Sequence, residues 1–198
     1  MAELQDVFAA IDAANARDPD RVEVAGALRP AAVVYGERMT AALQAFEPSA
    51  GVVLQIATRG QHIERWTVPR ATYPEGRVGY LTWRRELQRF HARRVGEILA
   101  ELGFDAGTAA RVGRIIRKER LQSDPEVQTL EDVACLVFIE HYLAPFAARQ
   151  DDDKLAGILA RTWRKMSPRA RAAVGAAPPP QRILDLLAVG LARAETRE

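Results

Sequence analysis

The chain has 198 residues, of which 48% are hydrophobic and 27% charged, as in an ordinary folded protein. Its 28 Lys and Arg residues nearly balance 26 Asp and Glu residues, so the net charge of +2 provides no strong field for nucleic acid. No apolar run approaches the roughly 20 residues that cross a bilayer, and a single cysteine, Cys135, excludes an internal disulfide. We therefore expect a cytoplasmic protein without a membrane or nucleic-acid partner.

Apolar residues recur at helical spacing along most of the chain, which predicts an all-α fold. The first predicted helix covers residues 2–16, the second runs from Pro30 to about Phe46, and the third follows Pro48 and reaches His62. Residues 52–54 alone would pass for a strand, but no pairing partner lies nearby. We find no convincing strand pair in the sequence.

Residues 65–83 show no helical period. The segment RWTVPRATYPEGRVGYLTW contains two Trp, two Tyr, three Arg, two Pro and two Gly. Loops of this length are usually functional or disordered, and so many aromatic residues argue against disorder. We predict a packed loop, which either lies at the mouth of a site or is a purely structural wrap.

Helical patterns resume at Trp83 and continue to the C-terminus. Predicted helices run from Trp83 to about Leu102, from a cap at Asp105, through Gln128–Tyr142, from the acidic cluster at residues 151–153, from Ser167-Pro168, and over Ile183–Leu191. We expect the fold to be built around the apolar stretch Gln128–Tyr142. The predicted architecture is one compact multi-helix domain over residues 1–174, followed by a Pro-rich linker and a packed amphipathic helix over residues 175–198.

Few polar residues stand out against these apolar faces. His62 ends one predicted helix, His91 lies in the middle of another, and Asp132 lies beside core-facing positions, with Glu37 and Glu119 on helices expected to border them. A buried carboxylate needs a partner, and helical proteins build metal sites from one or two residues on each of several helices. Imidazole with carboxylate suits Fe, Mn, Zn or Co. The alternative is that His91 is a satisfied core histidine, Asp132 a helix-start residue and Glu119 a solvated residue.

Three segments in order, FHARRVGEILAELGF, RVGRIIRKE and DPEVQTLEDVACLVFIEH, carry a family resemblance. Their order resembles the second half of the HD-domain superfamily of helical, metal-dependent phosphohydrolases. The resemblance implies an HD-like fold and a metal site formed by His62, His91, Asp132, Glu37 and Glu119. The defining His-Asp pair is absent, because Ile63 follows His62 and Ala92 follows His91.

On this resemblance we expect a metal-dependent hydrolase of a phosphorylated or nucleotide-like small molecule, since a bound metal makes hydroxide available near neutral pH. Arg65, Arg70 and Arg84 are the expected substrate-binding cations. Glu64 and Lys118 are the candidate catalytic residues, Glu64 as a general base or substitute ligand.

Other interpretations stay open. Loss of the pair aspartate could leave a two-iron site for oxygen chemistry, an inactive site, or a non-catalytic binding or adaptor domain, and RNA binding is a further possibility. The segments QHIERWTVPRATYP, GYLTWRRELQRFHA and LEDVACLVF are also similar to an uncharacterised bacterial and fungal domain family, over about residues 30–170. That similarity implies no activity.

Overall fold

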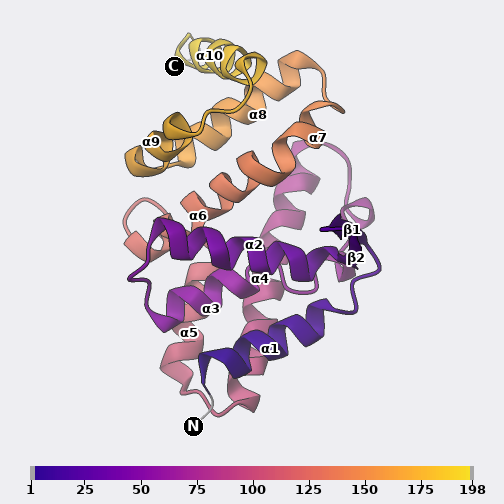
Figure 1. Cartoon of the computed structure of the whole chain (residues 1–198), viewed down its shortest axis with the longest axis vertical. Helices are drawn as coiled ribbons and strands as arrows, with labels where there is room; N and C mark the ends of the chain where they lie inside the picture. Colours follow the sequence, from indigo (N-terminus) through magenta and orange to yellow (C-terminus); the bar gives the residue numbers. More distant parts are fainter. Residues whose placement is uncertain (1–2, 197–198) are drawn as a thin grey trace. The chain divides into compact units, whose positions relative to one another are not determined.

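The computed structural model describes residues 3–196 and confirms the all-α prediction (Figure 1). The chain forms two compact units, residues 1–130 and residues 131–198. The division between them falls inside the apolar stretch Gln128–Tyr142 that was expected at the centre of one domain. The predicted boundary near residue 174 stays a prediction. None of the helices described is both long and apolar enough to cross a membrane.

Five helices make up most of the first unit (indigo to pink in Figure 1). They are α1 (Leu4–Asn15), α2 (Ala31–Phe46), α3 (Val52–Gly60), α4 (Gly76–Glu101) and α5 (Ala106–Ile116). Helix α3 contacts α1, α2 and α5, and α4 packs along α5. The core of this unit is formed by fully buried side chains on these helices, among them Ile11, Met39, Ile56, Val95 and Ile115.

A β-hairpin precedes α2, and the expectation that the chain contains no strand pair was wrong. Strands β1 (Arg21–Val24) and β2 (Ala27–Pro30) pair antiparallel, with Arg21 opposite Pro30. The two turn residues, Ala25 and Gly26, both have positive φ, at 52° and 79°, as the tight two-residue hairpin turn requires. Ala25 occupies a position where Asn or Asp is the usual signal, so the turn was not visible in the sequence.

The segment predicted as a loop over residues 65–83 is shorter than expected, because α4 begins at Gly76 rather than at Trp83. Residues 65–75 contain two short 3₁₀ turns, η1 (Arg65–Thr67) and η2 (Arg70–Thr72). The indole N–H of Trp83 donates to the Val68 carbonyl at 2.9 Å, and Tyr73 bonds to Glu86. Side chains of α4 therefore hold this segment as a packed loop.

The second unit begins within α6 (Pro125–Val137), which a π-helical segment (Phe138–Tyr142, η3 in sequence order) continues into α7 (Leu143–Ala147). Helices α8 (Asp152–Lys165), α9 (Pro168–Ala176) and α10 (Gln181–Glu195) follow. The predicted helix starts at Asp151 and Ser167 are confirmed, and both side chains cap their helices, α8 and α9. Helices α8 and α10 approach closely at Gly190, where a Cβ would lie 2.2 Å from the Ala156 carbonyl oxygen.

Candidate anion-binding site

Two of the predicted site residues, His62 and His91, lie side by side in the first unit. His62 is in the turn that follows α3, and His91 is in the middle of α4. Their ring centroids are 5.7 Å apart. The ring of Tyr35, from α2, stacks on His62 at 4.5 Å. His91 is fully buried, and His62 as a whole residue is half-buried.

Positive side chains surround this pair. Burial lowers the pKa of His62 well below its usual range, so the ring is neutral near pH 7. The neighbouring cations Arg65, Lys118 and Arg84 lower this pKa further, as does the coupling of His62 to the His91 ring. We call these residues together with Tyr35 the His–Arg cluster: Tyr35, His62, Arg65, Arg84, His91 and Lys118.

Arg65 is a half-buried cation that has an aromatic neighbour but no carboxylate partner among the described residues. Its guanidinium lies over the ring of Trp83, 4.8 Å from the centroid, and burial lowers its pKa. Across residues 3–196 it forms no ion pair with a carboxylate. Arg84 likewise contacts an aromatic ring, that of Tyr80 at 5.8 Å. A half-buried cation without a counter-ion is partly desolvated at a cost, so this region favours the arrival of an anion.

The end of helix α5 places Lys118 in the cluster. The amide of Lys118 donates to the Ile115 carbonyl and the amide of Glu119 to the Arg114 carbonyl, which is the Schellman pattern of a helix C-terminus. Lys118 occupies the left-handed position of that motif, with φ of 56°, where glycine is the usual residue. The backbone hydrogen bonds of this motif therefore fix the position of the Lys118 Cα, from which the side chain extends.

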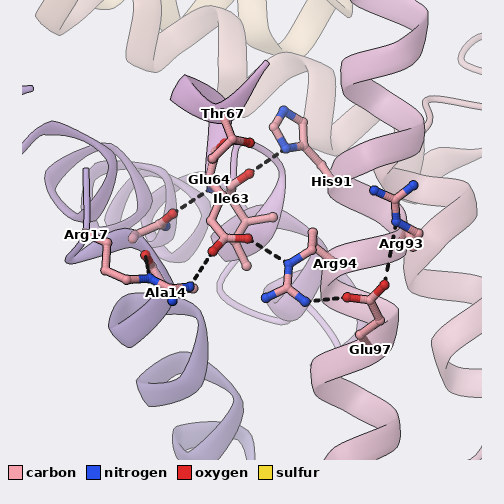
Figure 2. Close-up of polar contacts among 10 residues, drawn as sticks. Ala14, Arg17, Ile63, Glu64, Thr67, His91, Arg93, Arg94 and Glu97 are labelled. Atoms are coloured by element: carbon pink, nitrogen blue, oxygen red, sulfur yellow. Dashed lines mark hydrogen bonds and ion pairs between the residues drawn. The ribbon is translucent and has the colours of Figure 1, made fainter. Parts of the chain in front are cut away.

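The hydrogen bond of His91 determines which ring nitrogen carries the proton. Nδ1 lies 2.7 Å from the Ile63 carbonyl oxygen (Figure 2). A carbonyl can only accept, so Nδ1 carries the hydrogen and Nε2 has a lone pair. Nε2 is buried and has no hydrogen-bond partner among the residues described. Burial lowers the pKa of His91 to about 3, although the Ile63 bond acts in the opposite direction.

Glu64 lies in the turn between His62 and Arg65 and is held by the contacts that Figure 2 shows. Its carboxylate accepts from Arg17 of the α1–β1 connection at 2.6 Å and from Arg94 of α4 at 2.7 Å. Its backbone N–H donates to Asn15 Oδ1 at 2.9 Å, and its φ is 49°. Both carboxylate oxygens are therefore engaged by arginine in a buried position, where the sequence predicted a catalytic base or metal ligand.

The remaining predicted residues have other partners. Both oxygens of Glu37 accept from Arg29, at 2.6 and 2.8 Å, and this pairing lowers the pKa of Glu37. Glu119 pairs with Arg117 at 2.7 Å. Asp132 belongs to the second unit and accepts from the Ser167 amide at 2.8 Å. The guanidinium of Arg70 donates to the carbonyls of Tyr73 and Pro74.

Within the described part of the chain, no group of three or more His, Cys, Asp and Glu residues could hold a metal ion. The structure brings together two imidazoles and three cations of the predicted set, and the nearby carboxylate, Glu64, is paired with arginine. This donor set does not fit a divalent metal held by protein groups alone. The predicted metal centre stays a prediction.

Three residues that build the site had no assigned role in the sequence analysis. Tyr35 stacks on His62, Trp83 underlies Arg65, and Asn15 accepts from the Glu64 amide. Each comes from a different helix, and no local motif links them to His62. Only the concentration of aromatic residues and arginines in residues 65–83 indicated that this region was unusual.

Comparison with known proteins identifies a family for most of the chain. The sequence model of the family described as "Domain of unknown function (DUF4202)" matches residues 5–187. No match was found among curated proteins or among solved structures. The family match extends over parts of both units. The chain therefore belongs to the DUF4202 family of domains of unknown function.

Proposed function

We propose that the first unit binds a small molecule through its phosphate group at the His–Arg cluster. The observation that carries this proposal is Arg65, a largely enclosed guanidinium with no carboxylate partner among the residues described. A bound phosphate would supply the missing counter-charge, and the planar guanidinium fork matches phosphate oxygens.

The surrounding residues support a phosphate ligand. Arg65, Arg84 and Lys118 come from three elements, η1, α4 and the end of α5, and all three lie close enough to His62 to lower its pKa. The neutral rings of His62 and His91 add hydrogen-bonding groups without adding charge. A non-catalytic binding domain was one of the alternatives expected from the sequence, because the His-Asp pair is absent. Phosphate binding is such a function and requires no catalytic step.

A metal-dependent hydrolase is the second candidate, and the neighbouring rings of His62 and His91 favour it. The bond from His91 Nδ1 to a backbone carbonyl is the arrangement that metal-binding histidines commonly show. However, catalytic zinc sites usually have three protein ligands, and Arg65, Arg84 and Lys118 would repel a divalent ion. Elemental analysis of the purified protein separates the two candidates: a stoichiometric transition metal would favour the hydrolase.

Calorimetric titration with inorganic phosphate and with a nucleoside monophosphate tests the binding proposal. We expect Arg84→Gln and Arg65→Gln each to weaken binding by about tenfold or more, because each removes a charge-assisted hydrogen bond. Arg85→Gln is the matched control, since Arg85 is the exposed neighbour of Arg84 on α4. The proposal fails if the wild-type chain binds neither ligand, or if Arg85→Gln weakens binding as much as Arg84→Gln.

The proposal includes a cytoplasmic location. Its support is the lone thiol of Cys135, which is buried and not in a disulfide. Phosphorylated metabolites are the partners that such a site would meet there.

A further inference from the structure

We infer that the ligand of the His–Arg cluster must donate a hydrogen bond as well as carry negative charge, so that the cluster binds phosphate in preference to sulfate. This inference rests on the proposed phosphate-binding function and adds a selectivity to it. It depends on the lone pair of His91 Nε2, which is fixed by the backbone around Glu64.

Both ends of one peptide group fix the tautomer of His91. The peptide between Ile63 and Glu64 accepts from His91 Nδ1 at its carbonyl and donates to Asn15 at its N–H. Rotation of this peptide would break both hydrogen bonds. The ion pairs of Glu64 with Arg17, in the α1–β1 connection, and with Arg94, on α4, hold the same residue (Figure 2). His91 therefore keeps its hydrogen on Nδ1.

The lone pair on Nε2 then lacks a donor. The nitrogen is enclosed, and none of the described residues donates to it. The nearby arginines contact rings instead, Arg65 over Trp83 and Arg84 over Tyr80. A buried acceptor without a donor is destabilising. A ligand that brings its own donor removes this cost, whereas a ligand with only acceptor atoms adds repulsion between lone pairs.

His62 is a neighbouring ring that can move without losing a hydrogen bond, so we assign it the movement that admits the ligand. The residue is half-buried, its ring stacks on Tyr35, and no hydrogen bond to another described residue holds the ring. It lies 5.7 Å from the His91 ring. The charged and titratable groups around it are Arg65, Lys118, Arg84 and His91, together with the stacked Tyr35. Its rotation breaks no hydrogen bond within the described protein.

Phosphate and sulfate differ in the property that matters here. The two anions have the same tetrahedral shape, but inorganic phosphate keeps at least one P–OH group near neutral pH, and sulfate carries no proton. The cations can bind the oxygens of either anion, and only phosphate can also donate to His91 Nε2. In a phosphate ester, a neighbouring hydroxyl could provide the same donor. Sites built around a particular hydrogen bond reject analogues that lack the matching group.

Titration of the full chain with sodium phosphate and with sodium sulfate, at pH 7 and equal ionic strength, tests the inference. We expect phosphate to bind at least about tenfold more tightly than sulfate. In His91→Gln, whose amide can donate, we expect the ratio to approach one through a gain in sulfate affinity. His141→Gln is the matched control, because His141 lies in the second unit, and it should keep the wild-type ratio.

The outcomes separate the inference from the function on which it rests. Equal affinities for the two anions, both weakened by Arg84→Gln, would overturn the selectivity and leave the anion site in place. Absence of binding by either anion would overturn both. Nitrogen-15 NMR of the wild-type protein gives a test that does not depend on a folded variant. We expect the Nε2 resonance of His91 at the position of an unprotonated nitrogen, shifted by phosphate and not by sulfate; a protonated Nε2 in the ligand-free protein would refute the inference.

Discussion

Replacing Glu64 by glutamine should destabilise the first unit by about 2 kcal/mol. The change keeps the shape of the side chain and removes the charge that engages Arg17 and Arg94. A hydrogen bond to a charged group contributes roughly 1.5–3 kcal/mol. The side chain of Arg17 is 68% exposed and can regain water, whereas that of Arg94 is 27% exposed. We therefore assign the full cost to the bond with Arg94 and little cost to the bond with Arg17, which gives about 2 kcal/mol.

The assay is urea unfolding followed by tryptophan fluorescence in a Trp163→Phe background, so that only Trp66 and Trp83 of the first unit report. Glu97→Gln is the matched control, because Glu97 also pairs with Arg94 but its side chain is 44% exposed. Exposed pairs contribute about 0–1 kcal/mol, so this control should cost about 0.5 kcal/mol. If Glu64→Gln costs no more than Glu97→Gln, the reasoning about the buried ion pairs is refuted.

Two further predictions concern helix packing and acid stability. Gly190→Ala should destabilise the second unit by about 1–3 kcal/mol, because the new Cβ would lie 2.2 Å from the Ala156 carbonyl oxygen. Gly96→Ala is the control: its Cβ would meet nothing within 4 Å, so it should stabilise α4 by about 0.5–1 kcal/mol. Equal effects of the two changes in thermal unfolding would contradict the close approach of α8 and α10. The neutral His91, whose pKa is about 3 in the folded state and 6.5 when unfolded, should make the free energy of unfolding fall as the pH drops from about 6.5 towards 3. The reason is that the unfolded chain binds a proton that the folded chain does not. A His91→Gln variant should show a shallower decrease in denaturant titrations over this range, and an identical slope would contradict the burial of a neutral ring.

Much of the helical frame was predictable because its signals are local. Asp105, Asp151 and Ser167 each cap a helix, and the amide that each accepts from lies three residues further along the chain. Gly103, with φ of 79°, follows the end of α4 as expected. The early start of α4 was missed because Gly76 and Gly79 are poor helix residues, and the packed segment before the helix is visible only in three dimensions.

The site was only partly predictable, since its partners are distant in the sequence. The proximity of His62 and His91 was expected, and so was the presence of Arg65 and Arg84 near them. The role of Glu64 was not, because Arg17 and Arg94 lie 47 and 30 residues away. A carboxylate two residues from a histidine has the same appearance in a sequence whether it serves as a base or holds a turn.

The left-handed backbone at Lys118 has a consequence for how this family can change. Glycine at that position would relieve the strain of a side chain with positive φ and improve the end of α5. Selection for stability alone would therefore replace Lys118 by glycine. A lysine or arginine at this position in other family members would therefore indicate selection for ligand binding at the expense of folding stability, as is common at functional sites.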